Sequence, residues 1–172
     1  MSATLRSVLL ATATLLVLAA PASAKRYDVP AVMGDKLIAL NEESPLAVFL
    51  PQSLVLGYDG DLFAIVDATS SKAWTIDLAG DPECNGANAC TLAWLSAQKG
   101  AKRSNPTKVT LTKNVNGWFR KTSCGGSCSP GSIEFTRNKV LYEIQAKVAQ
   151  KGKSEKQLLI AAANSAISAG PR

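Results

Sequence analysis

The chain offers few residues for catalysis, because none of its 172 residues is a histidine. This excludes Ser-His-Asp and Cys-His catalytic groups, zinc sites with histidine ligands and imidazole pH switches. Ser96 and Lys99 have the S-x-x-K spacing in which a lysine can activate a serine nucleophile. That arrangement needs the serine at the start of a helix, whereas Ser96 ends a run of strand-forming residues and Lys99 enters a turn at Gly100. We therefore predict no catalytic residue from this pair.

The carboxylates are also poorly placed for acid–base catalysis. The pairs Glu42-Glu43 and Asp59-Gly60-Asp61 are neighbours in sequence, so they cannot line the two walls of a glycosidase cleft. Asp59-Gly60 is typical of a turn. A calcium-binding loop is less favoured here, because it needs more oxygen ligands. Asp77 is expected to face solvent from a strand, and Gly125-Gly126 is interpreted as loop geometry rather than an anion-binding nest. The sequence predicts no metal ion and no cofactor, and a hydrolase that works without histidine is the least favoured function.

The four cysteines form two close pairs. Cys84 and Cys90 bracket the turn-rich residues 85–89, and Cys124 and Cys128 bracket Gly125-Gly126-Ser127. Local pairing, Cys84 with Cys90 and Cys124 with Cys128, is favoured among the three connectivities that four cysteines allow. The alternatives are a four-cysteine zinc site or a redox pair, but both usually contain C-x-x-C, which is absent here.

The first 24 residues predict a secretory signal peptide. Arg6 precedes the apolar run 9–20, and Ala22-Ser23-Ala24 has the A-x-A form of a cleavage site. The apolar run is shorter than the roughly 20 residues of a membrane span, so no membrane anchor is expected. Cleavage after Ala24 leaves residues 25–172 as one exported domain, in the bacterial periplasm or secreted. Disulfide bonds fit such an oxidising compartment.

Most of the exported segment has the alternation and turn residues of antiparallel strands. Residues 25–50 are expected to be irregular, with short edge strands at Lys36–Leu40 and Leu46–Leu50. The pairs Lys99-Gly100 and Arg137-Asn138 are typical of hairpins, which indicates a meander of consecutive strands. The expected strands are Leu62–Asp67, Lys72–Ala79, Thr91–Ala97, Lys108–Thr112, Gly117–Lys121, Ser132–Phe135 and Lys139–Val148.

The end of the chain has a helical period instead. Ser154-Glu155-Lys156-Gln157 is a capping box, and Gly170-Pro171 is a stop signal. Leu158, Leu159 and several alanines lie between them at helical spacing. The predicted fold class is therefore α+β: an antiparallel meander sheet of six to seven strands with one C-terminal helix packed on a face.

Charge is divided unevenly along the exported segment. Residues 25–98 contain four basic and ten acidic side chains, whereas residues 99–172 contain fourteen basic and three acidic ones. Such asymmetry indicates a charged partner, unless the two halves interleave in space and neutralise each other.

The tryptophans Trp74, Trp94 and Trp118 all lie in predicted strands, and core packing is favoured for them. An exposed Trp118 beside basic residues would instead form a binding platform. The candidate binding residues are Lys99, Lys102, Arg103, Trp118, Arg120 and Lys121.

Several segments resemble a group of uncharacterised exported bacterial proteins. They are Leu50-Pro51, the CNGANAC segment from Cys84 to Cys90, and the CGGSCSP segment from Cys124 to Pro130. Tyr142-Glu143-Ile144 before a last alanine-rich helix is a further similarity. The resemblance covers most of residues 25–172, and it implies export and a small sheet-plus-helix domain. It carries over no active-site residue.

These features predict an exported, non-enzymatic binding protein, namely an inhibitor or immunity-type partner of an exported enzyme or toxin. Disulfide-shaped loops and the charge asymmetry favour it over catalysis. The alternative partner is an anionic envelope polymer or lipid bound by the basic second half. Nucleic acid is not an expected partner.

Overall fold

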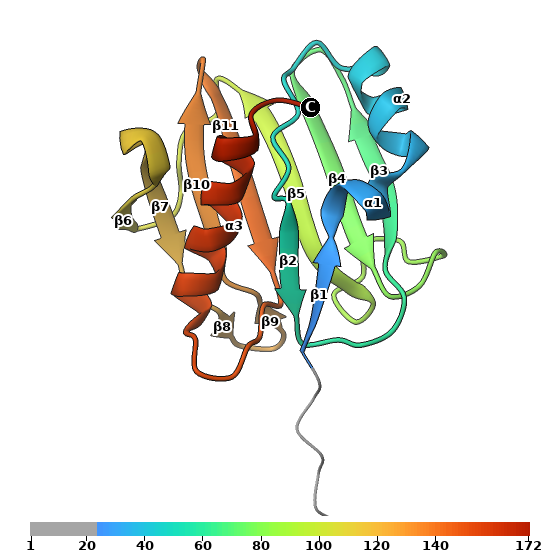
Figure 1. Ribbon diagram of the computed structural model, residues 1–172, viewed down its shortest axis with the longest axis vertical. Coiled ribbons are helices and arrows are strands. Elements are labelled where there is room, and N and C mark those ends of the chain that lie inside the picture. The colour runs from blue at the N-terminus through green and yellow to red at the C-terminus, as the bar shows by residue number, and fades with distance from the viewer. Residues whose placement is uncertain (1–23) are drawn as a thin grey trace, which may run out of the picture.

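The computed structural model describes residues 24–172, and its largest element is a seven-stranded antiparallel sheet. The strands lie in the order β3-β4-β5-β11-β10-β7-β6, with all helices on one face (Figure 1). This confirms the predicted α+β fold class. The predicted signal peptide lies, except for Ala24, outside the described residues. The bounds are β3 Phe63–Thr69, β4 Ala73–Ala79, β5 Thr91–Lys99, β6 Thr107–Thr110, β7 Asn116–Arg120, β10 Ser132–Arg137 and β11 Val140–Ala146.

The sheet consists of two meanders, β3-β4-β5 and β6-β7-β10-β11. They meet where β11 pairs with β5, from Val140 opposite Lys99 to Ala146 opposite Ala93. Each of the seven expected strands is present, with ends within two residues of the predicted ones. A single turn of 3₁₀-helix, η1 (Thr112–Asn114), joins β6 to β7, and the short strands β8 (Ser123–Cys124) and β9 (Cys128–Ser129) form a hairpin between β7 and β10.

The C-terminal helix α3 (Glu155–Ala169) contacts β2, β10 and β11. Ser154 caps it as predicted: its hydroxyl accepts from the Gln157 N–H, while the Gln157 side chain accepts from the Ser154 N–H at 2.8 Å. The helix buries Leu158, Leu159, Ala162, Ala163, Ala166 and Ile167, so small side chains let it approach the sheet closely. Among residues 24–172, no helix has the length and hydropathy needed to cross a membrane.

Residues 25–50 are more regular than the sequence indicated. Lys36–Leu40, expected as an edge strand, lies in helix α2 (Asp35–Glu43), which follows helix α1 (Val29–Met33). The side chain of Asp28 caps α1 by accepting from the Ala31 N–H at 3.0 Å, and Gly34 separates the helices with a φ of 51°. The prediction failed because a five-residue apolar run fits a helix as well as a strand.

The second expected edge strand, Leu46–Leu50, is also absent, although Leu46, Val48, Phe49 and Leu50 are buried. A different pair of strands, β1 (Lys25–Asp28) and β2 (Ser53–Leu56), forms a small antiparallel sheet in front of the main one (Figure 1). It shares a layer with the helices, so the core is enclosed between this layer and the main sheet.

Aromatic side chains fill the centre of the core. Trp74 is 1 % exposed, as predicted. Tyr142 stacks on Phe135 with ring centroids 5.3 Å apart and meets Phe49 edge-on at 5.1 Å. The Tyr142 hydroxyl donates to the Ala47 carbonyl at 2.9 Å, which supplies the polar partner that a buried phenol needs.

Candidate binding face

No helix covers the other face of the sheet in the described part of the chain (Figure 1), and we call this the open face. Strand alternation determines which side chains reach it, because residues at odd and even positions point to opposite sides. Along β5, Ala93, Leu95 and Ala97 are buried toward the helices, whereas Trp94 and Ser96 point outward and are half-buried. Strand pairing places further outward residues beside them: Thr75, Asp77, Glu143, Gln145, Ser132, Glu134, Trp118 and Arg120.

Residues 100–106, here called the strap, lead from β5 to β6 at the far edge of the sheet and cross the open face. The sequence predicted a hairpin at Lys99-Gly100, but the Gly100 N–H instead donates to the Lys139 carbonyl at 2.9 Å. The position of β5 explains the difference, because its free edge is taken by β11. The strap therefore brings Lys102 and Arg103 over the second meander.

Glu134 anchors the strap. Its carboxylate accepts from the Ser104 N–H at 2.9 Å, the Ser104 hydroxyl at 2.8 Å and the Asn105 N–H at 3.0 Å. The side chain of Asn105 continues the anchor by donating to the Ser132 hydroxyl at 2.9 Å and to the Trp118 carbonyl at 3.2 Å. Glu134 is 1 % exposed, so its charge is stabilised by these donors rather than by water.

Three predicted binding residues come together beneath and within the strap. The guanidinium of Arg103 lies 4.6 Å from the centroid of the Trp118 ring, which is a cation–π contact. Arg120 donates to Asn105 at 3.2 Å, to Ser129 at 3.1 Å and to Ser132 at 3.3 Å. It also lies 3.8 Å from the Glu143 carboxylate. Trp118 is half-buried on the open face, so the predicted core position is wrong for it, as it is for Trp94.

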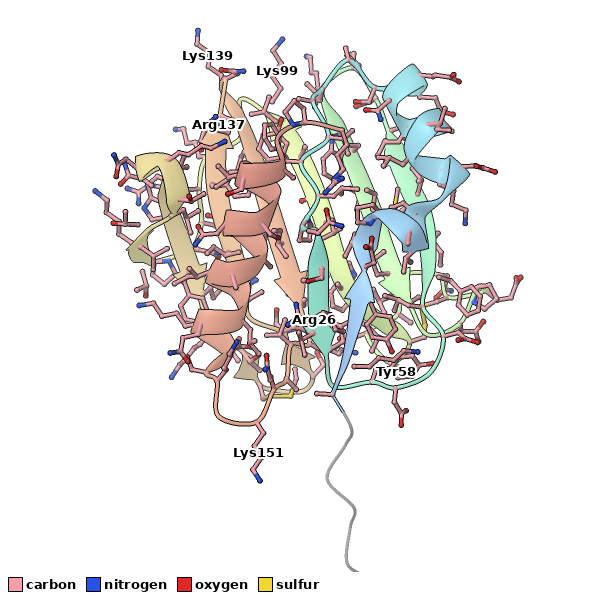
Figure 2. The ribbon with its side chains drawn as sticks, in the orientation of Figure 1. Arg26, Tyr58, Lys99, Arg137, Lys139 and Lys151 are labelled. Carbon is pink, nitrogen blue, oxygen red and sulfur yellow. A yellow bond between two sulfur atoms is a disulfide. The ribbon has the colours of Figure 1, made fainter. Side chains whose placement is uncertain are left out.

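The other predicted binding residues are exposed lysines. Lys99 lies at the end of β5, near Arg137 and Lys139 at the top of the sheet (Figure 2). Lys102 lies in the strap and Lys121 directly after β7. None of the amino groups of Lys99, Lys102 and Lys121 has a hydrogen-bond or ion-pair partner among residues 24–172. The predicted set is thus divided between a central platform and separate cations around it.

Both predicted disulfides are present, Cys84 with Cys90 and Cys124 with Cys128. The two loops touch, because the Asn88 side chain donates to the Cys128 carbonyl. Lys147 links them to the open face: its amino group donates to the Asn88 carbonyl and lies 5.8 Å from the Trp94 ring, and burial lowers the pKa of Lys147. The disulfides indicate folding in an oxidising, extracellular environment.

Asp77 is buried, which contradicts the expected solvent-facing position. It is 4 % exposed, and the loop closed by the first disulfide covers it, since a Cβ on Gly86 would lie 3.3 Å from its carboxylate. Within the described residues its carboxylate has no hydrogen-bond donor. Burial raises the pKa of Asp77, and the negative charge of Asp67 raises it further.

Replacing Asp77 by asparagine is expected to raise the free energy of unfolding at pH 7 by about 1 kcal/mol, because it removes a buried charge without a partner. The native state holds the Asp77 proton more tightly than the unfolded state, so the aspartate protein gains stability as the pH falls below the raised pKa. Urea unfolding at pH 7 and pH 4 should therefore show a smaller difference in the free energy of unfolding between the parent and Asp77→Asn at pH 4 than at pH 7. The control is Asp61→Asn at an exposed position, which is expected to change the free energy of unfolding by no more than about 0.5 kcal/mol. An Asp77→Asn protein that is less stable than the parent at pH 7 would contradict the interpretation.

The oppositely charged halves of the chain are separated in space. Residues 25–99 supply α1, α2 and the meander β3-β4-β5, while residues 100–172 supply α3 and the meander β6-β7-β10-β11 (Figure 1). The small β1–β2 sheet and residues 46–50, which contact Phe135 and Tyr142 of the other half, lie at the seam between them. The halves do not interleave, so the acidic and basic sides persist in the fold.

The three carboxylates of the basic half are all held internally. Glu134 binds the strap, and Glu143 lies beside Arg120. Glu155 accepts from the Thr122 N–H at 3.0 Å and from the Gly131 N–H at 3.1 Å. They therefore leave most of the fourteen basic side chains of this half without a nearby counter-charge.

The geometry argues against the one catalytic pattern of the sequence. Ser96 and Lys99 are three positions apart in β5, so their side chains point to opposite faces of the sheet. Glu134 and Glu143 are directly opposite each other on β10 and β11, but the first is occupied by the strap. Among residues 24–172, no cluster of three or more acidic or cysteine side chains could hold a metal ion.

Sequence reasoning missed Asn105, Glu134, Glu143 and Gln145 as parts of this face. The Gln145 side chain donates to the Ser129 hydroxyl and to the Pro130 carbonyl, both at 3.1 Å, and so ties β11 to the second disulfide hairpin. A glutamate inside the apolar strand Ser132–Arg137 was the available signal.

Comparison of the chain with known protein families, with curated proteins and with solved structures finds no match.

Proposed function

We propose that the protein is an exported, non-enzymatic binding protein of the bacterial periplasm or extracellular space. Its partner is an acidic surface of another exported protein, an enzyme or toxin that it inhibits or neutralises. The observation that carries the proposal is the spatial separation of charge, with an exposed basic half whose own carboxylates are already engaged. A surface of one sign attracts a partner of the other and accelerates association.

The strap and the adjacent β6–β7 edge are the proposed contact surface. Lys102, Lys108 and Lys121 are exposed there, and the Arg103–Trp118 pair adds a flat aromatic and cationic surface of the type enriched in interfaces. These residues come from three separate segments that meet only in the folded protein.

The surface is held rigid before any partner arrives. Glu134 fixes the strap, and two disulfides fix the neighbouring loops. A rigid surface loses less conformational entropy on binding, so more of the contact energy appears as affinity. The charged groups at the centre of the open face, Glu134, Glu143 and Arg120, are engaged in contacts that stabilise this surface. This supports a role in binding rather than in catalysis.

The test is capture of a partner from periplasmic extract, compared between two single substitutions. Lys102→Glu and Lys151→Glu change the net charge equally, and neither amino group has a partner among the described residues. Lys102 is in the strap, whereas Lys151 lies at the opposite end of the molecule from Lys99 (Figure 2). We expect Lys102→Glu to weaken binding about tenfold, and Lys151→Glu to leave it nearly unchanged.

The captured protein should be acidic, and raising the salt from 50 to 500 mM should release it, because exposed charges are screened over shorter distances. Equal binding by both variants, or the absence of a salt-sensitive protein, would contradict the proposal. A third experiment measures whether the immobilised protein retains purified anionic envelope polymer or lipid vesicles. Their retention by the parent and loss with Lys102→Glu would favour the envelope component as partner instead.

A further inference from the structure

A pocket of about 160 Å³ lies on the helix side of the sheet, between β2 and α3, away from the strap. Its walls are partly apolar, formed by Leu54 and Val55 of β2 and by Leu158 and Ala161 of α3. A water molecule occupies about 30 Å³ in the liquid, so the space suits a ligand of a few to about ten non-hydrogen atoms.

Two cations line this pocket without a counter-charge. Arg26 and Lys153 have no salt-bridge partner in residues 24–172, and Arg26 is held by one hydrogen bond, from its Nη1 to the Ser53 hydroxyl at 2.8 Å. Figure 2 shows Arg26 between the small β1–β2 sheet and α3. Two positive groups converging on one small space favour an anion.

Gln150 also lines the pocket, and its side-chain oxygen lacks a donor among residues 24–172. Oε1 of Gln150 is buried and has no hydrogen-bond partner in the described structure. An unpaired buried carbonyl costs free energy, and a ligand that donates a hydrogen bond would satisfy it. An anion without a proton, such as sulfate, can pair with the two cations but has no hydrogen to donate to this oxygen.

We propose that the pocket binds a small organic anion that carries a hydroxyl group, of the glycerol phosphate type. The anionic group lies between Arg26 and Lys153, the hydroxyl donates to Gln150 Oε1, and the carbon skeleton lies against Leu158 and Ala161. This ligand chemistry occurs both as a free solute and as the headgroup of an anionic phospholipid. The site is independent of the proposed protein-binding surface.

The test is calorimetric titration of the exported domain with glycerol 3-phosphate, sulfate and glycerol. We expect glycerol 3-phosphate to bind more tightly than sulfate, and glycerol not to bind. Lys153→Gln should weaken glycerol 3-phosphate about tenfold, the loss expected for one charge-assisted hydrogen bond, whereas the matched exposed control Lys151→Gln should not. Gln150→Leu should abolish the preference for glycerol 3-phosphate over sulfate.

Vesicles of phosphatidylglycerol distinguish the two sources of the headgroup. Binding to vesicles that Lys153→Gln abolishes identifies the lipid, and binding to glycerol 3-phosphate alone identifies the free solute. Absence of binding to both, or binding that Lys153→Gln and Lys151→Gln reduce equally, would overturn the proposal. So would a Gln150→Leu protein that keeps the preference for the hydroxyl-bearing ligand.

Discussion

Replacing Glu134 by alanine is expected to lower the free energy of unfolding by about 2–4 kcal/mol and to release the strap. The substitution removes a buried carboxylate that accepts hydrogen bonds from the Ser104 N–H, the Ser104 hydroxyl and the Asn105 N–H. Asn105 is 3 % exposed, so its N–H would stay buried without a partner, and charged hydrogen bonds are worth more than neutral ones. Equilibrium unfolding in urea measures the loss.

Thr136→Ala is the matched control for Glu134→Ala, because Thr136 points to the same face two positions along β10 but is exposed. It is expected to change stability by no more than about 0.5 kcal/mol. Limited trypsin digestion adds a local readout, since Lys102 and Arg103 lie within the strap. The Glu134→Ala protein should be cut there first, under native conditions that leave the parent intact. Unchanged protection of the strap would show that Glu134 does not anchor it.

Removing the first disulfide, with Cys84→Ser and Cys90→Ser together, should destabilise the protein by about 3 kcal/mol. Loss of the closed loop accounts for about 2 kcal/mol through the entropy of the unfolded chain. The remainder comes from burial, because Cys84 is 7 % exposed and its sulfur lies 3.2 Å from the hydroxyl of the fully buried Thr91. Urea unfolding is again the measurement.

The second disulfide provides the comparison. Cys124 and Cys128 are exposed, so replacing both by serine should cost only the loop term of about 2 kcal/mol. Parent protein unfolded in the presence of a reductant should lose about as much stability as the two double variants combined. A first-loop variant no less stable than the second-loop variant would show that the buried position of Cys84 contributes nothing.

Local patterns predicted the main sheet and α3 well. Alternation of apolar and polar residues fixed the strand positions, and the Ser154–Gln157 capping box marked the start of α3. Both signals act within a few residues, so a single sequence contains them. The helix α2 was missed because Lys36–Leu40 is too short to distinguish the two periods.

The candidate site was less predictable, because its environment comes from distant segments. Asp77 is buried by a loop that includes Gly86, and Glu134 is buried by a strap some thirty residues earlier in the chain. Alternation correctly placed Asp77 on the face opposite the core, yet it cannot show that loops cover that face. The basic residues Lys102 and Arg103 were identified from charge, but the position of Arg103 over Trp118 depends on the insertion of β11 beside β5.

The pairing of β5 with β11 also has a consequence for how the chain folds. Within each meander, neighbouring strands pair with strands close in sequence, so each can assemble locally. The β5–β11 seam joins segments separated by the strap and by all of β6 to β10, and closing so long a loop is slow because of its entropy. We therefore expect docking of two preformed halves to limit the folding rate. The acidic and basic halves attract each other, so added salt should slow the docking of the halves. The same screening should weaken the binding of an external charged partner.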